Sequence, residues 1–178
     1  VEQRTKELNI KNEELFKLSI TDKLTGLYNR VKLDSVLQEN MSLSLRYGNI
    51  FSVIIIDIDF FKKINDNFGH QVGDDVLKEC SYILSQNIRN VDILGRWGGE
   101  EFLVVCPETL KDGAKDLAIK LNKAIKLHKF STYPHSVTIS VGVASCSVND
   151  LNYDDIISNA DKALYEAKNN GRDRVEIF

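Results

Sequence analysis

The sequence lacks most of the features that mark secreted, membrane-spanning or duplex-binding chains. Its 178 residues include only three cysteines and two prolines, and the cysteines form no Cys-x-x-Cys pair. We therefore expect free thiols in a reducing compartment rather than disulfides or a zinc site. No apolar run approaches the length of a membrane span, and no signal-peptide pattern is present. Lys and Arg number 23 against 26 Asp and Glu, so no basic excess indicates a nucleic-acid partner.

The composition is that of one globular domain. Hydrophobic residues make up 43% and charged residues 28% of the chain, which is an ordinary balance at this length. Because the chain opens on Val1 rather than a methionine, we expect it to be part of a longer protein. We expect a cytoplasmic location and no membrane contact by this part, which leaves membrane anchoring of the longer protein open.

Residues 1–19 have the pattern of a linking helix that precedes the domain. Val1, Leu8 and Leu15 recur every seven residues, with Leu18 three further on and charged residues between them. This spacing predicts a short coiled coil, with a surface helix lying on the domain as the alternative. Residues 20–178 are expected to form the domain itself.

The rest of the chain alternates helical and extended patterns. We expect helices over residues 30–47, 74–88, 109–128 and 152–170, with Thr109 capping the third. We expect strands over residues 51–59, 92–97, 101–106, 136–146 and 174–178. Residues 60–73 are expected to be a loop or a short helix, and Gly98-Gly99 a two-residue hairpin turn.

This order of elements predicts a ferredoxin-like α+β fold of the palm type. It gives a βαββαβ core followed by one further helix and strand. We expect a central antiparallel sheet flanked by helices that cover one side of it. Polymerase palms and nucleotide cyclases share this topology, but a fold alone does not define a function.

Acidic residues follow two of the expected strands. Asp57 and Asp59 close the first strand, and Glu100 and Glu101 follow the glycine turn. In the predicted topology these strands are neighbours, so their carboxylates converge and repel one another unless a cation lies between them. Mg²⁺ binds a few carboxylates together with phosphate oxygens, so the pattern indicates nucleotidyl or phosphoryl transfer. Solvated or lysine-paired acids are the alternative, and strand alternation does not decide which acid of each pair binds a metal.

Five blocks of this sequence resemble one family. Residues 96–102, Arg-Trp-Gly-Gly-Glu-Glu-Phe, resemble the signature of the GGDEF domains, the diguanylate cyclases, in its Glu-Glu variant. Residues 22–30 are similar to the family's Asp-x-Leu-Thr-Gly-Leu-x-Asn-Arg opening, and residues 57–74 reproduce its second block. Residues 140–144 and 160–174 are similar to the last two blocks, so the resemblance runs from about residue 20 to the C-terminus.

The resemblance implies an activity and its partners. Two domains of a homodimer would face each other, each holding one GTP, and would join the two molecules into cyclic di-GMP with release of two pyrophosphates. The implied cofactor is Mg²⁺ or Mn²⁺. The N-terminal helix would pair the two domains, and an N-terminal sensory domain would precede it in the full-length protein.

The resemblance also implies roles for individual residues at the acidic end of the first strand. Asp57 and Glu100 would ligate the metal, helped by the carbonyl of Ile58. Asp57, Glu100 and Lys62 would be the catalytic residues. Each of these positions matches the family's motif in this sequence.

A further set of positions is implied in substrate binding. The set is Phe60, Phe61, Lys62, Asn65, Asp74, Gly98, Gly99, Lys168 and Arg172. Asn65 and Asp74 would bind guanine, since Asp74 can accept hydrogen bonds from N1 and N2, which adenine cannot supply. The others would hold phosphates through backbone N–H groups, close backbone approach or a cationic side chain. From spacing alone, Lys168 and Arg172 could equally be two cations that stabilise a helix C-terminus by interacting with its dipole.

A second, regulatory site is implied by Arg89-Asn90-Val91-Asp92. It resembles the family's Arg-x-x-Asp site for product inhibition, with Arg89 and Asp92 as the binding residues. The planar guanidinium of an arginine can stack on guanine and donate two hydrogen bonds to a phosphate. The alternative is that these four residues form an ordinary surface turn. Lys115 or Lys120 is the candidate for a further basic partner. Separately, Asp22 is expected either to pair with Arg96 or to cap a turn.

Overall fold

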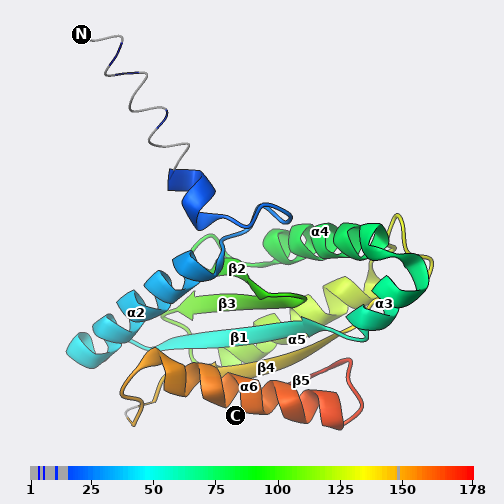
Figure 1. The fold of residues 1–178 in the computed structure, drawn as a ribbon. Helices are drawn as coiled ribbons and strands as arrows, with labels where there is room; N and C mark the ends of the chain where they lie inside the picture. The colour runs from blue at the N-terminus through cyan, green and yellow to red at the C-terminus, as the bar shows by residue number, and fades with distance from the viewer. Residues whose placement is uncertain (1–3, 5, 7–10, 12–15, 148) are drawn as a thin grey trace.

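A five-stranded sheet forms the centre of the fold (Figure 1). The structure is a computed structural model that describes residues 4, 6, 11, 16–147 and 149–178. The strands are β1 (Phe51–Ile58), β2 (Ile93–Gly98), β3 (Glu101–Pro107), β4 (Ile139–Ser145) and β5 (Arg174–Ile177). The helices are α2 (Arg30–Tyr47), α3 (Phe61–Phe68), α4 (His70–Asn87), α5 (Lys111–Leu127) and α6 (Tyr153–Asn169).

The strand order is β2-β3-β1-β4-β5, which is the order of the predicted βαββαβ core with one strand added. β1 is antiparallel to both β3 and β4, and β2 is antiparallel to β3. β5 joins β4 in parallel, so the complete sheet is mixed. The predicted palm-type α+β fold is confirmed. β1 is the central strand, so its C-terminal end lies between β3 and β4.

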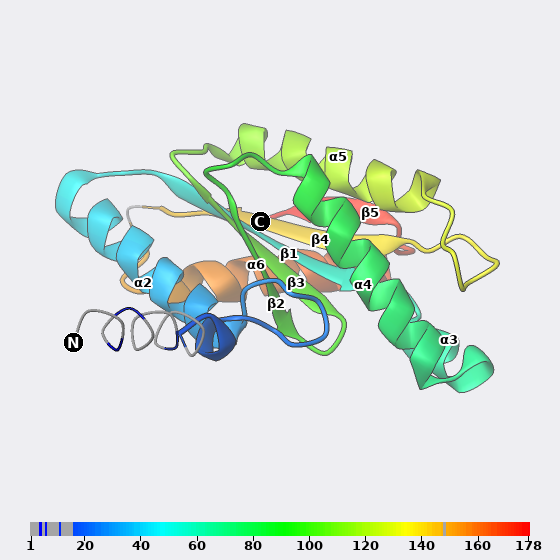
Figure 2. The ribbon, with the colours of Figure 1, turned by 90° about the horizontal axis from the view of Figure 1, so that it is seen from above.

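Helices cover both faces of this sheet, so the prediction of cover on one side is wrong. Alternate residues of β1 enter two separate cores: Ile54 and Ile56 pack against α4 and α5, whereas Val53 and Ile55 pack against α2 and α6. Figure 2 shows α2 and α6 on the face opposite α5. The reason is that β1 is apolar on both faces, and the two helices outside the βαββαβ core bury the second one.

Gly142 in β4 allows α6 to lie directly on the sheet. A Cβ at this position would be 2.1 Å from the Ala160 carbonyl oxygen and 2.4 Å from the Leu164 nitrogen. Any side chain would therefore push the helix outward. Because α6 packs this closely, its last turn reaches the end of β1.

α4 begins four residues earlier than predicted. The segment 60–73 contains α3 and the first turn of α4, and Gly69, with φ 86° and ψ 159°, separates the two helices. The sequence pattern predicts that the helix begins after Gly73, but Gly73 lies inside α4. Its lack of a side chain serves packing rather than termination.

Thr109 does not cap α5, which begins at Lys111. The N-cap position is Leu110, and it makes no capping hydrogen bond from its side chain. Thr109 Oγ1 donates to the Pro107 carbonyl at 2.8 Å instead. The threonine therefore stabilises the strand end rather than the helix start.

The described residues before the domain are helical through residues 16–20. Thr21 ends this helix by donating Oγ1 to the Lys17 carbonyl at 2.9 Å. Val1, Leu8 and Leu15, which carry the coiled-coil prediction, lie outside the described residues. Among the residues described, no helix has both the length and the apolar character needed to cross a membrane.

Candidate active site

Asp57 lies at the C-terminal end of β1, the central strand, where β3, β4 and α6 meet. We name this end of the sheet, with Asp57, Glu100 and Glu101, the acidic edge. Its side chain is 9% exposed, and Oδ2 lies 2.8 Å from Nζ of Lys168 in α6. Burial raises the pKa of this carboxyl; the Lys168 ammonium opposes the rise, and the charges of Glu100 and Asp59 add to it. Asp57 therefore occupies a crowded negative environment that a bound cation would relieve.

Asp59, two residues further on, holds the fold together. Its Oδ1 accepts a hydrogen bond from Ser140 Oγ at 2.6 Å. Its Oδ2 accepts from Thr138 Oγ1 at 2.8 Å and from the Asp173 N–H at 3.0 Å. These contacts fasten β4 and the turn after α6 to the end of β1. Of the two acids, only Asp57 pairs with a cation of the acidic edge.

We expect Asp59→Ala to lower the free energy of unfolding by about 2–4 kcal/mol, because three donors around a buried carboxylate lose their acceptor. Urea denaturation measures the change. Asp66→Ala, which removes an exposed acid of α3, is the matched control and should change stability by less than about 0.5 kcal/mol. Equal effects of the two substitutions would contradict a stabilising role for the hydrogen bonds of Asp59.

The tip of the β2–β3 hairpin consists of Gly99 and Glu100, not of the predicted pair Gly98-Gly99. Gly98 pairs with Glu101 across the hairpin because the register shifts at Trp97. Of the two glycines only Gly99 has a positive φ, 51°. Glu100 therefore lies on the turn, whereas Glu101 lies in the strand.

The hairpin tip is fastened on two sides. The Ile58 N–H donates to the Glu100 carbonyl at 3.4 Å, which places the tip beside the end of β1. Arg96 Nε donates to the Gly99 carbonyl at 2.9 Å, and Arg96 Nη1 lies 3.2 Å and 3.3 Å from the two carboxylate oxygens of Asp22. The expected Asp22–Arg96 pair is confirmed, and it joins the segment after the N-terminal helix to the turn of Glu100.

We expect this pair to stabilise the domain at neutral pH and less so in acid. Burial acts to raise the pKa of Asp22, but hydrogen bonds from Thr25 and the charge of Arg96 hold it below its ordinary value. The contribution is therefore complete above the ordinary carboxyl pKa of about 4 and is lost as the pH falls through the lower folded-state value. A double-mutant cycle with Asp22→Asn and Arg96→Met should give about 1 kcal/mol of coupling at pH 7 and clearly less at pH 3. Coupling that does not change with pH would contradict the ion pair.

Glu101 is an acid of this edge to which the sequence analysis assigned no role. It is the direct cross-strand partner of Asp57 in the β1–β3 ladder. Burial raises its pKa first, the charges of Asp57, Asp161 and Glu100 raise it further, and Lys168 acts against them. Directly paired residues share a face of the sheet, so the register would have revealed Glu101. The edge thus holds more negative charge than the motif alone indicates.

The turn between β1 and α3 presents backbone N–H groups beside these acids. Phe60 has a left-handed φ of 57°, which is uncommon for a residue other than glycine. α3 begins at Phe61, and its first N–H groups have no acceptor within the helix. Lys62 is exposed in the same turn. A helix start of this kind, with a lysine beside it, attracts anions such as phosphate.

The last turn of α6 brings two cations to the same edge. Lys168 contacts Asp57, as described above, and Arg172 follows in a left-handed turn that begins at Gly171, with φ values of 110°, 64° and 48° over residues 171–173. The Arg172 guanidinium lies 4.6 Å from the centroid of the Phe60 ring, and its Nη1 donates to the Lys168 carbonyl at 3.4 Å. Cations and amide donors therefore surround the acidic end of β1.

Asn65 of α3 and Asp74 of α4 lie close to the α3–α4 junction. A Cβ on Gly73 would lie 1.9 Å from Asn65 Oδ1, so only glycine lets the Asn65 side chain lie against α4 beside the backbone of Asp74. Both side chains are half-buried. An amide and a carboxylate at this junction offer donors and acceptors that suit a purine edge.

Arg89 and Asp92 lie at the α4–β2 connection, away from the acidic edge. Asp92 Oδ2 accepts from the Arg89 N–H at 2.9 Å, and the Asp92 N–H donates to the Arg89 carbonyl at 3.1 Å. Asp92 is 7% exposed, and its Oδ1 has no hydrogen-bond partner among the residues that the structure describes. Lys120 of α5 lines the same cavity of about 320 Å³ as Arg89 and donates Nζ to the Asn87 carbonyl at 2.8 Å.

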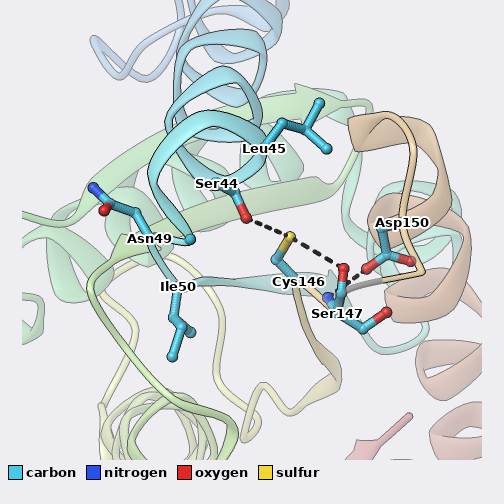
Figure 3. Close-up of a pocket in the computed structure, with 8 residues that line it drawn as sticks. Ser44, Leu45, Asn49, Ile50, Cys146, Ser147 and Asp150 are labelled. Atoms are coloured by element: carbon cyan, nitrogen blue, oxygen red, sulfur yellow. Dashed lines mark hydrogen bonds between the residues drawn. The ribbon is translucent and has the colours of Figure 1, made fainter.

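A cavity of about 250 Å³ lies at the opposite end of the sheet from Asp57 (Figure 3). Its lining residues are Ser44, Leu45, Gly48, Asn49, Ile50, Cys146, Ser147 and Asp150. Cys146 Sγ lies 3.2 Å from Ser44 Oγ, and burial raises the pKa of the thiol. A protonated thiol is a weak nucleophile, so this cavity adds no chemistry to the acidic edge.

Protein atoms alone do not complete a metal site at the acidic edge. Within the described part of the chain, no three His, Cys, Asp or Glu side chains are grouped so that they could hold a metal ion. Asp57 and Glu100 supply two carboxylates, and Ile58 adds a carbonyl. Mg²⁺ commonly takes one or two carboxylates plus phosphate oxygens, so this donor set fits a cation that arrives with a nucleotide.

A palm-type sheet with paired carboxylates, free helix-start amides and two cations at one end is typical of nucleotide cyclases and polymerase palms. Residues 19–174 match the family described as "Diguanylate cyclase, GGDEF domain", and the chain belongs to this family.

Relatives of known name or structure resemble the chain over most of its length. Response regulator PleD of Caulobacter vibrioides is 39% identical over 163 residues, covering 89% of this chain and 36% of PleD. The coiled coil and GGDEF domain of DgcB from Caulobacter crescentus, in complex with c-di-GMP, has a TM-score of 0.92 at 26% identity, covering 99% of this chain and 94% of that chain. The active GGEEF domain of a diguanylate cyclase from Vibrio cholerae has a TM-score of 0.80 at 37% identity, covering 84% and 96%. The chain spans about a quarter to a half of the length of the first curated relatives.

Proposed function

We propose that this domain condenses two GTP molecules into cyclic di-GMP and releases two pyrophosphates. The observation that carries the proposal is that the end of β1, which carries Asp57, lies beside the hairpin tip that carries Glu100, with Lys168 of α6 on the Asp57 carboxylate. The similarity to an active GGEEF domain of a diguanylate cyclase supports the same reaction. In each half-reaction a 3′-hydroxyl forms a bond to the α-phosphorus of the other GTP, and the bond to pyrophosphate breaks.

In this proposal the chain's residues bind, orient and neutralise the substrate. Asn65 and Asp74 hydrogen-bond the guanine edge. The N–H groups of Phe60 and Phe61, with Lys62, hold the phosphates at the start of α3. The cationic end of α6, Lys168 and Arg172, pairs with the β- and γ-phosphates. Gly98 and Gly99 let the hairpin backbone approach the α-phosphate.

Asp57, Glu100 and the carbonyl of Ile58 would hold the divalent cation, for which we propose Mg²⁺ or Mn²⁺. When bound, such a cation lowers the pKa of a coordinated hydroxyl and neutralises the charge of the leaving pyrophosphate. The contact of the Glu100 carbonyl with the Ile58 N–H and the acids around Asp57 support this placement. Lys62 is proposed to assist as a catalytic cation at the phosphates.

A single domain holds one GTP in this proposal, so activity requires a homodimer with the two acidic edges facing each other. We propose that residues 1–19 pair the domains as a short coiled coil and connect them to an N-terminal sensory domain. The similarity to a structure of a coiled coil with a GGDEF domain supports that arrangement. We further propose a cytoplasmic location, which suits three free cysteines and a GTP substrate.

Incubation of the wild-type chain with GTP and Mg²⁺ or Mn²⁺, followed by chromatography of the products, tests the proposed function. We expect a product that coelutes with cyclic di-GMP, and no product when the metal is chelated. Formation of a different nucleotide, or no turnover by a chain shown to be dimeric, would contradict the proposal.

We propose in addition that Arg89 and Asp92 bind the product as an inhibitory site, with Lys120 as the further basic partner. The two hydrogen bonds between Arg89 and Asp92 support this role, because they fix the turn that carries both residues. Lys120 is favoured over Lys115 because it lines the cavity of Arg89.

Arg89→Ala is expected to raise the cyclic di-GMP concentration for half-inhibition at least about tenfold, since a charge-assisted fork contributes roughly 1.5–3 kcal/mol. Initial rates at increasing product concentrations measure this shift. Arg46→Ala, at the exposed end of α2, is the control and should leave inhibition unchanged. A wild-type protein without product inhibition would remove the basis for the site.

A further inference from the structure

Lys168 has two competing partners, the Asp57 carboxylate and the substrate phosphates. The proposed function assigns its ammonium to the substrate phosphates and assigns Asp57 to the divalent cation. In the structure, Lys168 Nζ lies 2.8 Å from Asp57 Oδ2. An ammonium has three N–H donors, so it can bridge a carboxylate and a phosphate as long as no other cation occupies the carboxylate. A divalent cation on Asp57 would end that arrangement, because it takes the carboxylate that the ammonium contacts.

We propose that the ammonium of Lys168 competes with the divalent cation for Asp57 and moves to the substrate phosphates when the cation binds. Lys168 would then couple metal binding to nucleotide binding, because the phosphates give the displaced ammonium a new partner. The inference rests on the proposed function and adds a regulatory step within the same site.

The charges of the site support this exchange. Asp57 is 9% exposed and lies among Glu100, Glu101 and Asp59, so it needs a positive partner. Leaving a buried carboxylate without a partner is costly, and the lysine removes that cost. A divalent cation on the same carboxylate would repel the ammonium, since both are positive and close together.

The lysine is also free enough to move. Its side chain is 32% exposed and has a flexible four-carbon stem, and it lies in the last turn of α6. The amide donors at Phe60 and Phe61 mark where phosphates would lie, on the same edge of the sheet. A partly exposed side chain at a helix end can leave Asp57 without moving the buried core.

Arg172 provides a matched comparison on the same helix end. Its guanidinium lies on the Phe60 ring and donates to a backbone carbonyl, and no contact described for it involves a carboxylate. Removing Arg172 changes the net charge of the edge by the same amount as removing Lys168. Only removal of Lys168 frees Asp57.

The test is the affinity for Mn²⁺ without nucleotide, which Asp57, Glu100 and the Ile58 carbonyl alone would make weak, measured by electron paramagnetic resonance of free Mn²⁺ up to millimolar concentrations. We expect Lys168→Met to bind Mn²⁺ about fivefold more tightly than the wild type, the factor that a partly exposed ion pair represents. Arg172→Met should change the affinity by less than about twofold, because screening weakens charges that do not compete directly. Lys162→Met, an exposed lysine of α6, should have no effect.

Lys168→Gln is the second variant if Lys168→Met fails to fold. Unchanged or weaker Mn²⁺ binding by the folded Lys168 variant would overturn the inference. Equal tightening in Arg172→Met would also overturn it, because the effect would then be one of net charge. The measurement needs no turnover: a chain that makes cyclic di-GMP but shows no Lys168 effect refutes the exchange alone. A Lys168 effect in a chain without cyclase activity refutes the proposed function and leaves the competition for Asp57 standing.

Discussion

Glu100→Gln is expected to slow cyclic di-GMP formation by at least about 1,000-fold, because it removes one of only two carboxylates proposed to hold the cation. GTP affinity should fall much less, since the guanine and phosphate contacts come from other residues. The fold should persist, because the hairpin tip is fastened through the backbone of Gly99 and Glu100. Product chromatography gives the rate, and calorimetry with a non-reactive GTP analogue gives the affinity.

Glu39→Gln is the control for this change. Glu39 is an exposed acid of α2, so the same replacement there should leave the rate within about twofold of the wild type. A Glu100→Gln rate within tenfold of the wild type would contradict the assignment of Glu100. An equal loss of analogue binding would instead assign Glu100 to substrate binding.

Asp74→Ala is expected to weaken binding of a non-reactive GTP analogue about 100-fold, because two hydrogen bonds to a charged acceptor are lost. Affinity for the matching ATP analogue should hardly change, since adenine has no donors at these positions. The preference for guanine over adenine should therefore largely disappear. Calorimetric titration with both analogues measures the preference directly.

Two further substitutions make the guanine assignment specific. Asp75→Ala removes the neighbouring acid, which pairs with Lys78 on the helix surface, and should leave the preference intact. Gly73→Ala should lower the preference, because the new Cβ would displace the Asn65 side chain. Selectivity retained in Asp74→Ala would show that guanine is read elsewhere.

The fold was largely predictable because its signals are local and strong. The unbroken apolar run of β1 is typical of a strand buried on both faces, and α2 covers residues 30–47 as predicted, with Asn29 as its N-cap and Gly48 as its C-cap. The same run should have indicated helices on both faces, since a strand that is apolar on both sides needs cover on both. The parallel pairing of β5 with β4 was not predictable, because it depends on the turn after α6.

The site was less predictable where it depends on register and on side-chain partners. Periodicity could not separate Asp57 from Asp59, whereas the structure shows Asp59 engaged by Ser140, Thr138 and the Asp173 N–H. The one-residue register shift at Trp97 moved the hairpin tip to Gly99 and Glu100. Such a shift is a property of strand pairing, which one sequence does not display.

Gly73 illustrates the same limit in a helix. In sequence, a glycine before Asp74 is typical of a helix boundary. In the structure it lies inside α4, and its missing side chain accommodates Asn65 of α3. Contacts between two helices decided its role, so no local pattern could have revealed it.

The most direct test of the central claim is a phosphorus NMR time course of the wild-type chain with GTP and Mg²⁺, at protein concentrations that span the monomer and the dimer. We expect the triphosphate signals to fall while pyrophosphate and a cyclic phosphodiester appear, with two pyrophosphates for each cyclic di-GMP. We also expect the rate per domain to rise with protein concentration until dimerisation is complete. Release of inorganic phosphate or GMP instead of pyrophosphate, or a rate per domain that is already maximal for the monomer, would contradict the claim.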